Sequence, residues 1–214
     1  EAFPKVYALE EKYGSLIKGQ IQGAKERKKT GAVSRQNAPK LSFDQGVQVL
    51  PDALSRHLGH IVKTRTKVER IRLSEGKWYV SSEVKSFDGV ILALPAFRLA
   101  GLEFEGADQI NLQPLKSIIY PPVASVVLGF RREDVAHPLN GFGALVPEVE
   151  NRHTLGTIFS SSLFEGRAPK DHVLLTSYVG GMRQPALAVA GHDRLCELTL
   201  EDLRSLYGIS GEPT

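Results

Sequence analysis

The chain has 214 residues, of which 42% are hydrophobic and 24% charged, and its formal net charge is +3. This composition is typical of a globular protein with enough apolar residues for a sizeable core. The small charge excess argues against a nucleic-acid partner, so none is predicted. One cysteine excludes an internal disulfide, and the six histidines lack metal-ligand spacing, so no metal site is predicted.

Membrane-spanning and targeting segments are also absent from the sequence pattern. No apolar run approaches the roughly 18 residues that a transmembrane helix requires. The chain begins at Glu1, without Met and without a signal peptide. We therefore expect it to be a piece of a longer protein.

The first predicted elements are helices. Apolar residues recur at helical spacing over residues 3–29, and Pro4 lies near the first turn, where its missing N–H does no harm. Residues 30–41 are polar and predict a connection. A second helix is expected over residues 51–58, with Asp52 near its positive end.

From residue 61 the pattern changes to strands. Residues 61–71, 78–84 and 89–94 predict a three-stranded meander. Glu75 and Gly76 form its first turn, because this dipeptide tolerates the backbone that a tight hairpin needs. We expect a small sheet in the first half of the chain.

The second half predicts a larger sheet. Residues 123–130 read VASVVLGF, almost wholly apolar, which predicts a central strand covered on both faces. Three further runs complete a predicted four-stranded antiparallel sheet: 141–147, 154–160 and 173–179. A final helix is expected over residues 193–207, ended by Gly208.

The most informative segments lie between residues 141 and 181. They read GFGALVP, HTLGTIFSSSLFEGRAP and VLLTSYVGG, and glycine beside an aromatic residue lets a flat ligand or a second backbone come close. These runs closely resemble the substrate-domain sheet of the protoporphyrinogen oxidases, FAD enzymes within the amine-oxidase-like flavoproteins. The segments FPKVYALEEKYGSLIKG and VLPDALSRHLG are similar to the same family. The resemblance runs in order from Phe3 to Thr214.

The resemblance implies an α+β fold that contains parts of two domains. Part of an FAD-binding domain, a three-stranded β-meander plus a helix, would be joined to a substrate domain with a mainly antiparallel sheet and flanking helices. Residues 1–40 would be a helical segment of the substrate domain and a connection. Residues 41–96 would belong to the FAD-binding domain, and residues 97–214 to the substrate-binding domain.

The dinucleotide fingerprint of such enzymes is missing. A G-x-G-x-x-G turn between a strand and a helix normally holds the FAD pyrophosphate. The glycines at 14, 19 and 23 are too widely spaced and lie in a helical pattern. We therefore expect the chain to be an internal part of the enzyme that is inactive alone, with FAD bound by the intact protein and weakly or not at all by this part.

Four residues match functional positions of the family. Val68, in RTKVERI, matches the position whose backbone amide and carbonyl contact the FAD adenine. Leu145 and Ile158 match aliphatic positions that clamp one pyrrole ring, and Tyr178 matches an aromatic or large apolar position, commonly Phe or Met, that packs on another ring. Without the resemblance, all four would be ordinary strand or core residues. No residue is assigned a catalytic role, because the flavin carries the chemistry.

For the intact protein, the resemblance implies oxidation of protoporphyrinogen IX to protoporphyrin IX in haem and chlorophyll synthesis. It also implies peripheral membrane contact and a homodimer. The expected location is the cytoplasm, with peripheral membrane association, for a bacterial source, and the plastid for a plant-like source. Two alternatives stay open: a related FAD amine oxidase or desaturase-like enzyme, and a porphyrin-binding module without redox activity.

Overall fold

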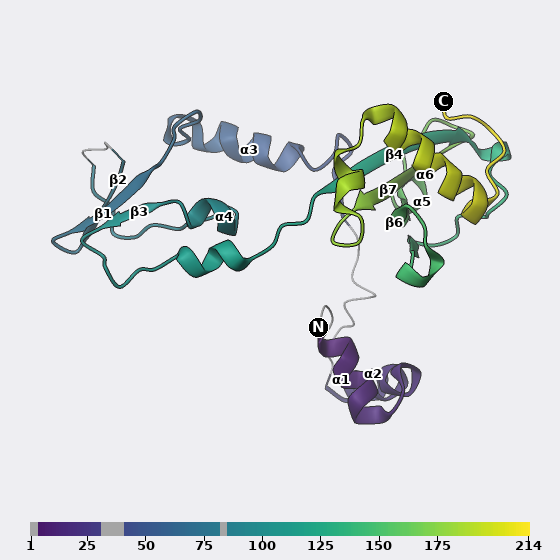
Figure 1. Ribbon diagram of the computed structural model, residues 1–214, viewed down its shortest axis with the longest axis horizontal. Coiled ribbons are helices and arrows are strands. Elements are labelled where there is room, and N and C mark those ends of the chain that lie inside the picture. Colours follow the sequence, from purple (N-terminus) through teal and green to yellow (C-terminus); the bar gives the residue numbers. More distant parts are fainter. Residues whose placement is uncertain (1–3, 31–40, 82–84) are drawn as a thin grey trace. The chain divides into compact units, whose positions relative to one another are not determined.

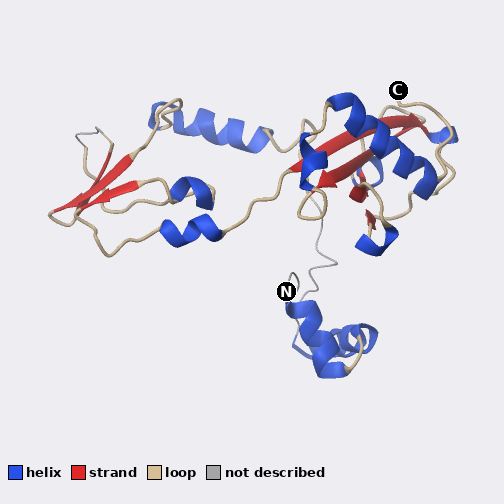
Figure 2. Cartoon of the chain, viewed as in Figure 1, coloured by secondary structure: helices blue, strands red, loops and turns tan. Residues whose placement is uncertain are grey.

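The computed structural model describes residues 4–30, 41–81 and 85–214, which form helices and two separate sheets (Figure 1). Two compact units make up the chain, residues 1–53 and 54–214. The α-helices are α1 Pro4–Tyr13, α2 Leu16–Thr30, α3 Val49–Leu58, α4 Ala96–Leu99, α5 Ser160–Leu163 and α6 His192–Tyr207. The strands are β1 Arg70–Ser74, β2 Lys77–Val80, β3 Glu103–Glu105, β4 Val123–Arg131, β5 Gly143–Leu145, β6 Thr154–Phe159 and β7 His172–Gly180. This mixture confirms the predicted α+β class (Figure 2).

Two helices replace the single helix predicted over residues 3–29, so that prediction is wrong at its middle. Gly14 takes a left-handed backbone with φ 68°, and its N–H donates to the Glu10 carbonyl at 2.7 Å. This geometry ends α1, because glycine adopts it without a Cβ clash. The connection predicted over residues 30–41 lies almost wholly outside the described residues. Helix α3 confirms the helix predicted over residues 51–58 and begins two residues earlier.

The small sheet has the strand order β2-β1-β3. The β1–β2 hairpin confirms the predicted turn: Glu75 and Gly76 have φ values of 51° and 72°. The predicted meander is wrong in its third strand, because residues 89–94 form no strand and β3 pairs parallel with β1 instead. Most of the strand predicted over residues 61–71 precedes β1 as irregular backbone.

Strand β2 is shorter than the strand predicted over residues 78–84. Ser81 takes φ 51°, a left-handed backbone that ends the extended run at Val80. Residues 82–84 lie outside the described part of the chain. Beyond them, Phe87 returns to form an isolated antiparallel bridge with Trp78.

The large sheet has the order β4-β7-β6-β5, and every pair is antiparallel, which confirms the predicted four-stranded sheet. Strand β4 lies at the edge of this sheet, so the prediction of a central strand covered on both faces is wrong. Val126, Leu128 and Phe130 are buried, whereas Val123 and Val127 are about half exposed. An apolar sequence predicts a strand but cannot specify how many neighbours it has.

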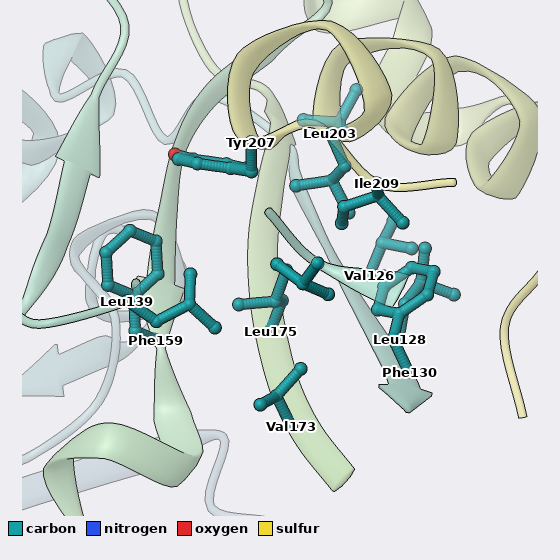
Figure 3. Packing of buried hydrophobic residues seen from close by; sticks show 12 residues of the cluster. Val126, Leu128, Phe130, Leu139, Phe159, Val173, Leu175, Leu203, Tyr207 and Ile209 are labelled. Atoms are coloured by element: carbon teal, nitrogen blue, oxygen red, sulfur yellow. The ribbon is translucent and has the colours of Figure 1, made fainter. Parts of the chain in front are cut away.

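One face of the large sheet carries the core, and α6 covers it (Figure 3). Leu175 of β7 and Leu203 of α6 are fully buried there. The ring of Tyr207 meets the ring of Phe159 edge to face, with centroids 5.3 Å apart. Gly208, with φ 61°, donates its N–H to the Arg204 carbonyl and ends α6, which confirms the predicted cap.

Candidate functional site

The opposite face of the large sheet brings the predicted substrate residues together. Leu145 of β5 stands opposite Gly156 of β6, and Gly156 stands opposite Tyr178 of β7. Ile158 lies two residues along β6 and therefore points to the same face. Three neighbouring strands thus present Leu145, Ile158 and Tyr178 side by side.

These three side chains line one cavity of about 330 Å³. Its other lining residues are Phe142, Gly143, Ala144, Leu155, Gly156 and Thr157. None of these nine residues is charged. Thr157 turns its hydroxyl away to the core side of the sheet, where it lies 2.9 Å from the Ser177 hydroxyl. The cavity therefore suits an apolar group rather than an ionic one.

Two glycines allow the strands to approach closely at this site. Gly143 has φ 145°, and a Cβ there would lie 2.1 Å from the Thr157 carbonyl oxygen. A Cβ on Gly156 would lie 2.7 Å from the Ala144 carbonyl oxygen and 3.1 Å from Leu145 Cδ2. The cavity floor is therefore bare backbone, with the side chain of Leu145 standing over it.

Leu155 enters the cavity through an irregularity that the sequence did not reveal. Thr154 pairs with Val179 while Gly156 pairs with Tyr178, so β6 contains one residue more than β7 at this point. Such a β-bulge bends a strand and re-aims its side chains. Here it places Leu155 at the cavity wall. Phe142, which was not among the predicted site residues, forms another part of the wall.

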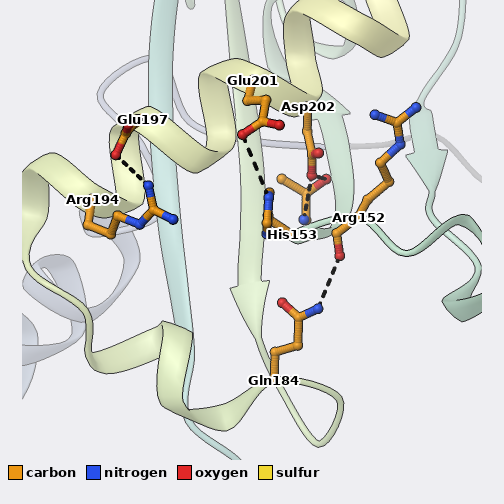
Figure 4. A network of polar contacts seen from close by, with 8 residues as sticks. Arg152, His153, Gln184, Arg194, Glu197, Glu201 and Asp202 are labelled. Atoms are coloured by element: carbon orange, nitrogen blue, oxygen red, sulfur yellow. Dashed lines mark hydrogen bonds and ion pairs between the residues drawn. The ribbon is translucent and has the colours of Figure 1, made fainter.

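Polar contacts fix the start of β6 (Figure 4). The Asp202 carboxylate accepts hydrogen bonds from the amide and the hydroxyl of Thr154. Gln184, just after β7, donates from its side chain to the Arg152 carbonyl at 3.4 Å. The approach to the bulge is therefore held by both α6 and the segment after β7.

Val68 lies in a different cavity, of about 1340 Å³, lined also by Thr66, Ser81 and Leu94. The expectation that Val68 sits in a strand is wrong, because β1 begins two residues later. Its amide and carbonyl have no backbone hydrogen-bond partner within the described ranges. They are therefore available to a ligand that offers a donor and an acceptor side by side.

Charged residues flank Val68 on both sides. Lys67 Nζ lies 2.5 Å from Glu69 Oε1. The hydrogen bond and the charge of this ammonium group lower the pKa of Glu69.

Among the described residues, no group of three or more His, Cys, Asp or Glu side chains is arranged to hold a metal ion. Nor does any helix in those ranges combine the length and apolarity needed to cross a bilayer.

Comparison with known proteins assigns the family. Residues 1–214 match the model of the flavin-containing amine oxidoreductases. The chain belongs to this family. It is 32% identical to protoporphyrinogen oxidase 2, chloroplastic/mitochondrial, of Arabidopsis thaliana, a match that covers 99% of the chain and 47% of the relative. It is 34% identical to the mitochondrial protoporphyrinogen oxidase of Nicotiana tabacum, over 100% of the chain and 48% of the relative.

Two more distant matches agree with this family assignment. The coproporphyrinogen III oxidase of Bacillus subtilis is 24% identical over 99% of the chain and 45% of its own length. A crystal structure from Exiguobacterium sp. 255-15, assigned provisionally as a protoporphyrinogen oxidase, superimposes with a TM-score of 0.71 at 21% identity, covering 99% of this chain and 44% of that one. These comparisons confirm the resemblance and the fold. The chain spans about half the length of the curated relatives it matches.

Proposed function

We propose that the complete protein containing this chain oxidises protoporphyrinogen IX to protoporphyrin IX in haem and chlorophyll synthesis. The main support is the uncharged cavity in which Leu145, Ile158 and Tyr178 meet. A porphyrinogen is a large, mostly apolar macrocycle, so burial of its faces should supply most of the binding energy, at about 25 cal/mol per Å². Contact with the aromatic ring of Tyr178 would add about 1 kcal/mol.

In this proposal the sheet binds and orients the substrate. Leu145 is 85% exposed, so it can bury most of its side chain against a pyrrole ring. Ile158 would support the same ring from the neighbouring strand, and Tyr178 would pack on a second ring. A macrocycle held against this surface would also exclude water from the floor formed by Gly156.

The cofactor of the proposed enzyme is FAD. The unpaired backbone groups of Val68 fit an adenine ring, which offers a donor and an acceptor on one edge. When bound, FAD would accept the electrons of one two-electron oxidation at a time, and dioxygen would reoxidise it to give hydrogen peroxide after each, so that three such cycles remove six electrons and six protons from the macrocycle. We assign residues 41–96 to the FAD-binding domain and residues 97–214 to the substrate-binding domain, except that β3 (Glu103–Glu105) pairs with β1 and adds a strand to the first sheet. The pyrophosphate would be held by residues that this sequence does not contain.

The proposal extends to the surroundings of the complete protein. It includes a homodimer and peripheral contact with a membrane. The location would be the cytoplasmic side of a bacterial membrane or, for a plant-like source, the plastid. Light scattering of the purified protein and co-sedimentation with lipid vesicles would test the dimer and the membrane contact.

The amine oxidase alternative is less well supported by the cavity. A protonated amine requires a carboxylate or another polar partner when it leaves water. None of the nine lining residues carries a carboxylate. A porphyrin-binding module without redox activity would use the same cavity and differs only in lacking turnover.

Turnover by the full gene product separates these functions. Protoporphyrinogen IX and putrescine would be supplied separately to the FAD-loaded protein under air, with porphyrin fluorescence and hydrogen peroxide as the measured products. We expect rapid formation of fluorescent porphyrin and no peroxide from putrescine. Putrescine oxidation would favour the amine oxidase, and tight porphyrin binding without turnover would favour the binding module. Either result would overturn the proposal.

A further inference from the structure

The bulge in β6 places an apolar side chain, Leu155, in the wall of the cavity. Leu155 and Gly156 both stand against Tyr178, because β6 carries an extra residue between its pairs with Val179 and Tyr178. The Leu155 side chain also extends toward the end of β7, since a Cβ added to Gly181 would lie 3.0 Å from Leu155 Cδ1. Leu155 therefore forms the part of the cavity wall that lies nearest the end of β7.

None of the residues that line the cavity at this end is charged. Arg183 lies nearby in the chain, but it does not line the cavity: its Nη2 donates to the Val146 carbonyl at 3.0 Å, and its Nη1 is buried without a partner among the described residues. A carboxylate placed against Leu155 would lose water without gaining a cation from the lining residues, and the hydroxyl of Tyr178 is a neutral donor that does not replace a cation. That loss is costly, because a buried charge needs a partner.

The number of carboxylates distinguishes two related substrates. Every pyrrole of coproporphyrinogen III carries a propionate, whereas two pyrroles of protoporphyrinogen IX carry a vinyl group instead. A pocket without charge can accept a vinyl-bearing pyrrole and should reject one that bears a propionate. Both chemistries occur among the relatives of this chain, which include protoporphyrinogen and coproporphyrinogen III oxidases.

We infer that Leu155 is a specificity-determining residue that packs against a vinyl-bearing pyrrole and excludes propionate, so that the site favours the dicarboxylate over the tetracarboxylate. This inference rests on the proposed function. The sequence around Leu155, an apolar strand, does not indicate this role in substrate selection.

Porphyrin binding to the full gene product tests the inference without requiring turnover. Protoporphyrin IX and coproporphyrin III would be titrated by fluorescence into the wild type, Leu155→Ala, Leu155→Arg and the control Leu174→Ala. Leu174 is a partly buried leucine of the same sheet that does not line the cavity. Thermal melting of each variant would establish that it is folded.

We expect Leu155→Ala to weaken protoporphyrin IX binding about five- to tenfold, which corresponds to the loss of part of a buried leucine side chain. Leu155→Arg should weaken protoporphyrin IX and strengthen coproporphyrin III, because it supplies a cation for propionate. The ratio of the two Kd values should shift at least about tenfold. Leu174→Ala should leave this ratio unchanged.

The outcomes separate the inference from the function beneath it. A wild type that prefers protoporphyrin IX, with the same preference in Leu155→Ala and Leu155→Arg, would overturn the inference and leave the proposed function standing. A wild type that binds neither porphyrin would overturn the proposed function. If Leu155→Arg fails to fold, Leu155→Gln replaces it, and an unchanged Kd ratio in that variant counts against the inference.

Discussion

The carboxylate of Asp202, on α6, accepts two hydrogen bonds from Thr154, the first residue of β6: one from the amide at 2.7 Å and one from the hydroxyl at 2.9 Å. Both residues are almost fully buried, with exposures of 2% and 0%. No ion pair involving Asp202 occurs among the described residues. Because Thr154 directly precedes the bulge, this contact fixes the point at which Leu155 turns into the cavity.

Replacing Asp202 by alanine should destabilise the protein. The amide and hydroxyl of Thr154 would remain buried without their acceptor, so we expect the free energy of unfolding to fall by about 2–4 kcal/mol. Urea denaturation measures this change. Glu201→Gln is the matched control on the same helix, where a side chain that is 68% exposed should contribute less than about 0.5 kcal/mol. Equal stability of the two variants would contradict the assigned role of Asp202.

A methyl group on the cavity floor should close the site. Gly156→Ala would place its Cβ 2.7 Å from the Ala144 carbonyl oxygen, so β5 would have to move and carry Leu145 with it. We expect protoporphyrin IX binding to weaken at least about tenfold, or more than 1.4 kcal/mol. Gly141→Ala serves as the control, because a Cβ there meets nothing within 4 Å and its φ is not positive. The account of the floor fails if both variants bind like the wild type.

Tyr207 should make stability fall at alkaline pH. Burial raises the pKa of its phenol above 10.0, and the neighbouring Thr157 side chain opposes this only in part. The unfolded chain would therefore lose the phenolic proton first, and stability should decline as the pH rises above about 10 toward the higher folded-state pKa. The decline should be smaller in Tyr207→Phe. Urea denaturation at pH 8 to 11 measures both, and parallel pH profiles would argue against this role.

Tyr207→Phe should change the stability of the protein little at neutral pH. The Tyr207 hydroxyl is buried near the Thr157 side chain, whose hydroxyl pairs with Ser177 instead, so no hydrogen-bond partner for Tyr207 occurs in the described part of the chain. Removing an unpaired hydroxyl forfeits no hydrogen bond, so the free energy of unfolding of Tyr207→Phe should stay within about 1 kcal/mol of wild type.

Val68 should contribute to FAD binding through its backbone amide and carbonyl rather than its side chain. Val68→Ala keeps the amide and carbonyl, and we expect FAD affinity of the full gene product to change less than about threefold. Val68→Pro removes the N–H and should weaken binding at least about tenfold, the usual scale for a lost hydrogen bond in a dry site. Flavin fluorescence titration measures both. Equal affinities for the two variants would exclude a contact from the Val68 amide.

Local chemistry made several elements predictable from the sequence. The Glu75–Gly76 turn follows from two adjacent residues that accept positive φ, and the end of α6 follows from Gly208. The wall formed by Leu145, Ile158 and Tyr178 was predicted from family resemblance. The three side chains line one cavity.

Features that depend on distant partners were not predictable. Strand β3 has three residues and pairs with β1 across more than 30 positions, so no local pattern announces it. Strand β4 is at the edge because β7 is the single described strand that pairs with it, and its own sequence does not indicate the number of its neighbours. The bulge at Leu155 exists only in the register between β6 and β7, so Leu155 cannot be distinguished from a core leucine by its sequence context.

The most direct test of the central claim is the oxidation of protoporphyrinogen IX by the FAD-loaded full gene product carrying Leu145→Ala, Ile158→Ala and Tyr178→Ala together. We expect kcat/KM to fall at least about 100-fold, or 2.7 kcal/mol, while the protein stays folded. Leu175→Ala, in the core on the other face, should cost about 2–5 kcal/mol of stability and leave kcat/KM nearly unchanged below its melting temperature. A triple variant that turns over like the wild type would contradict the account.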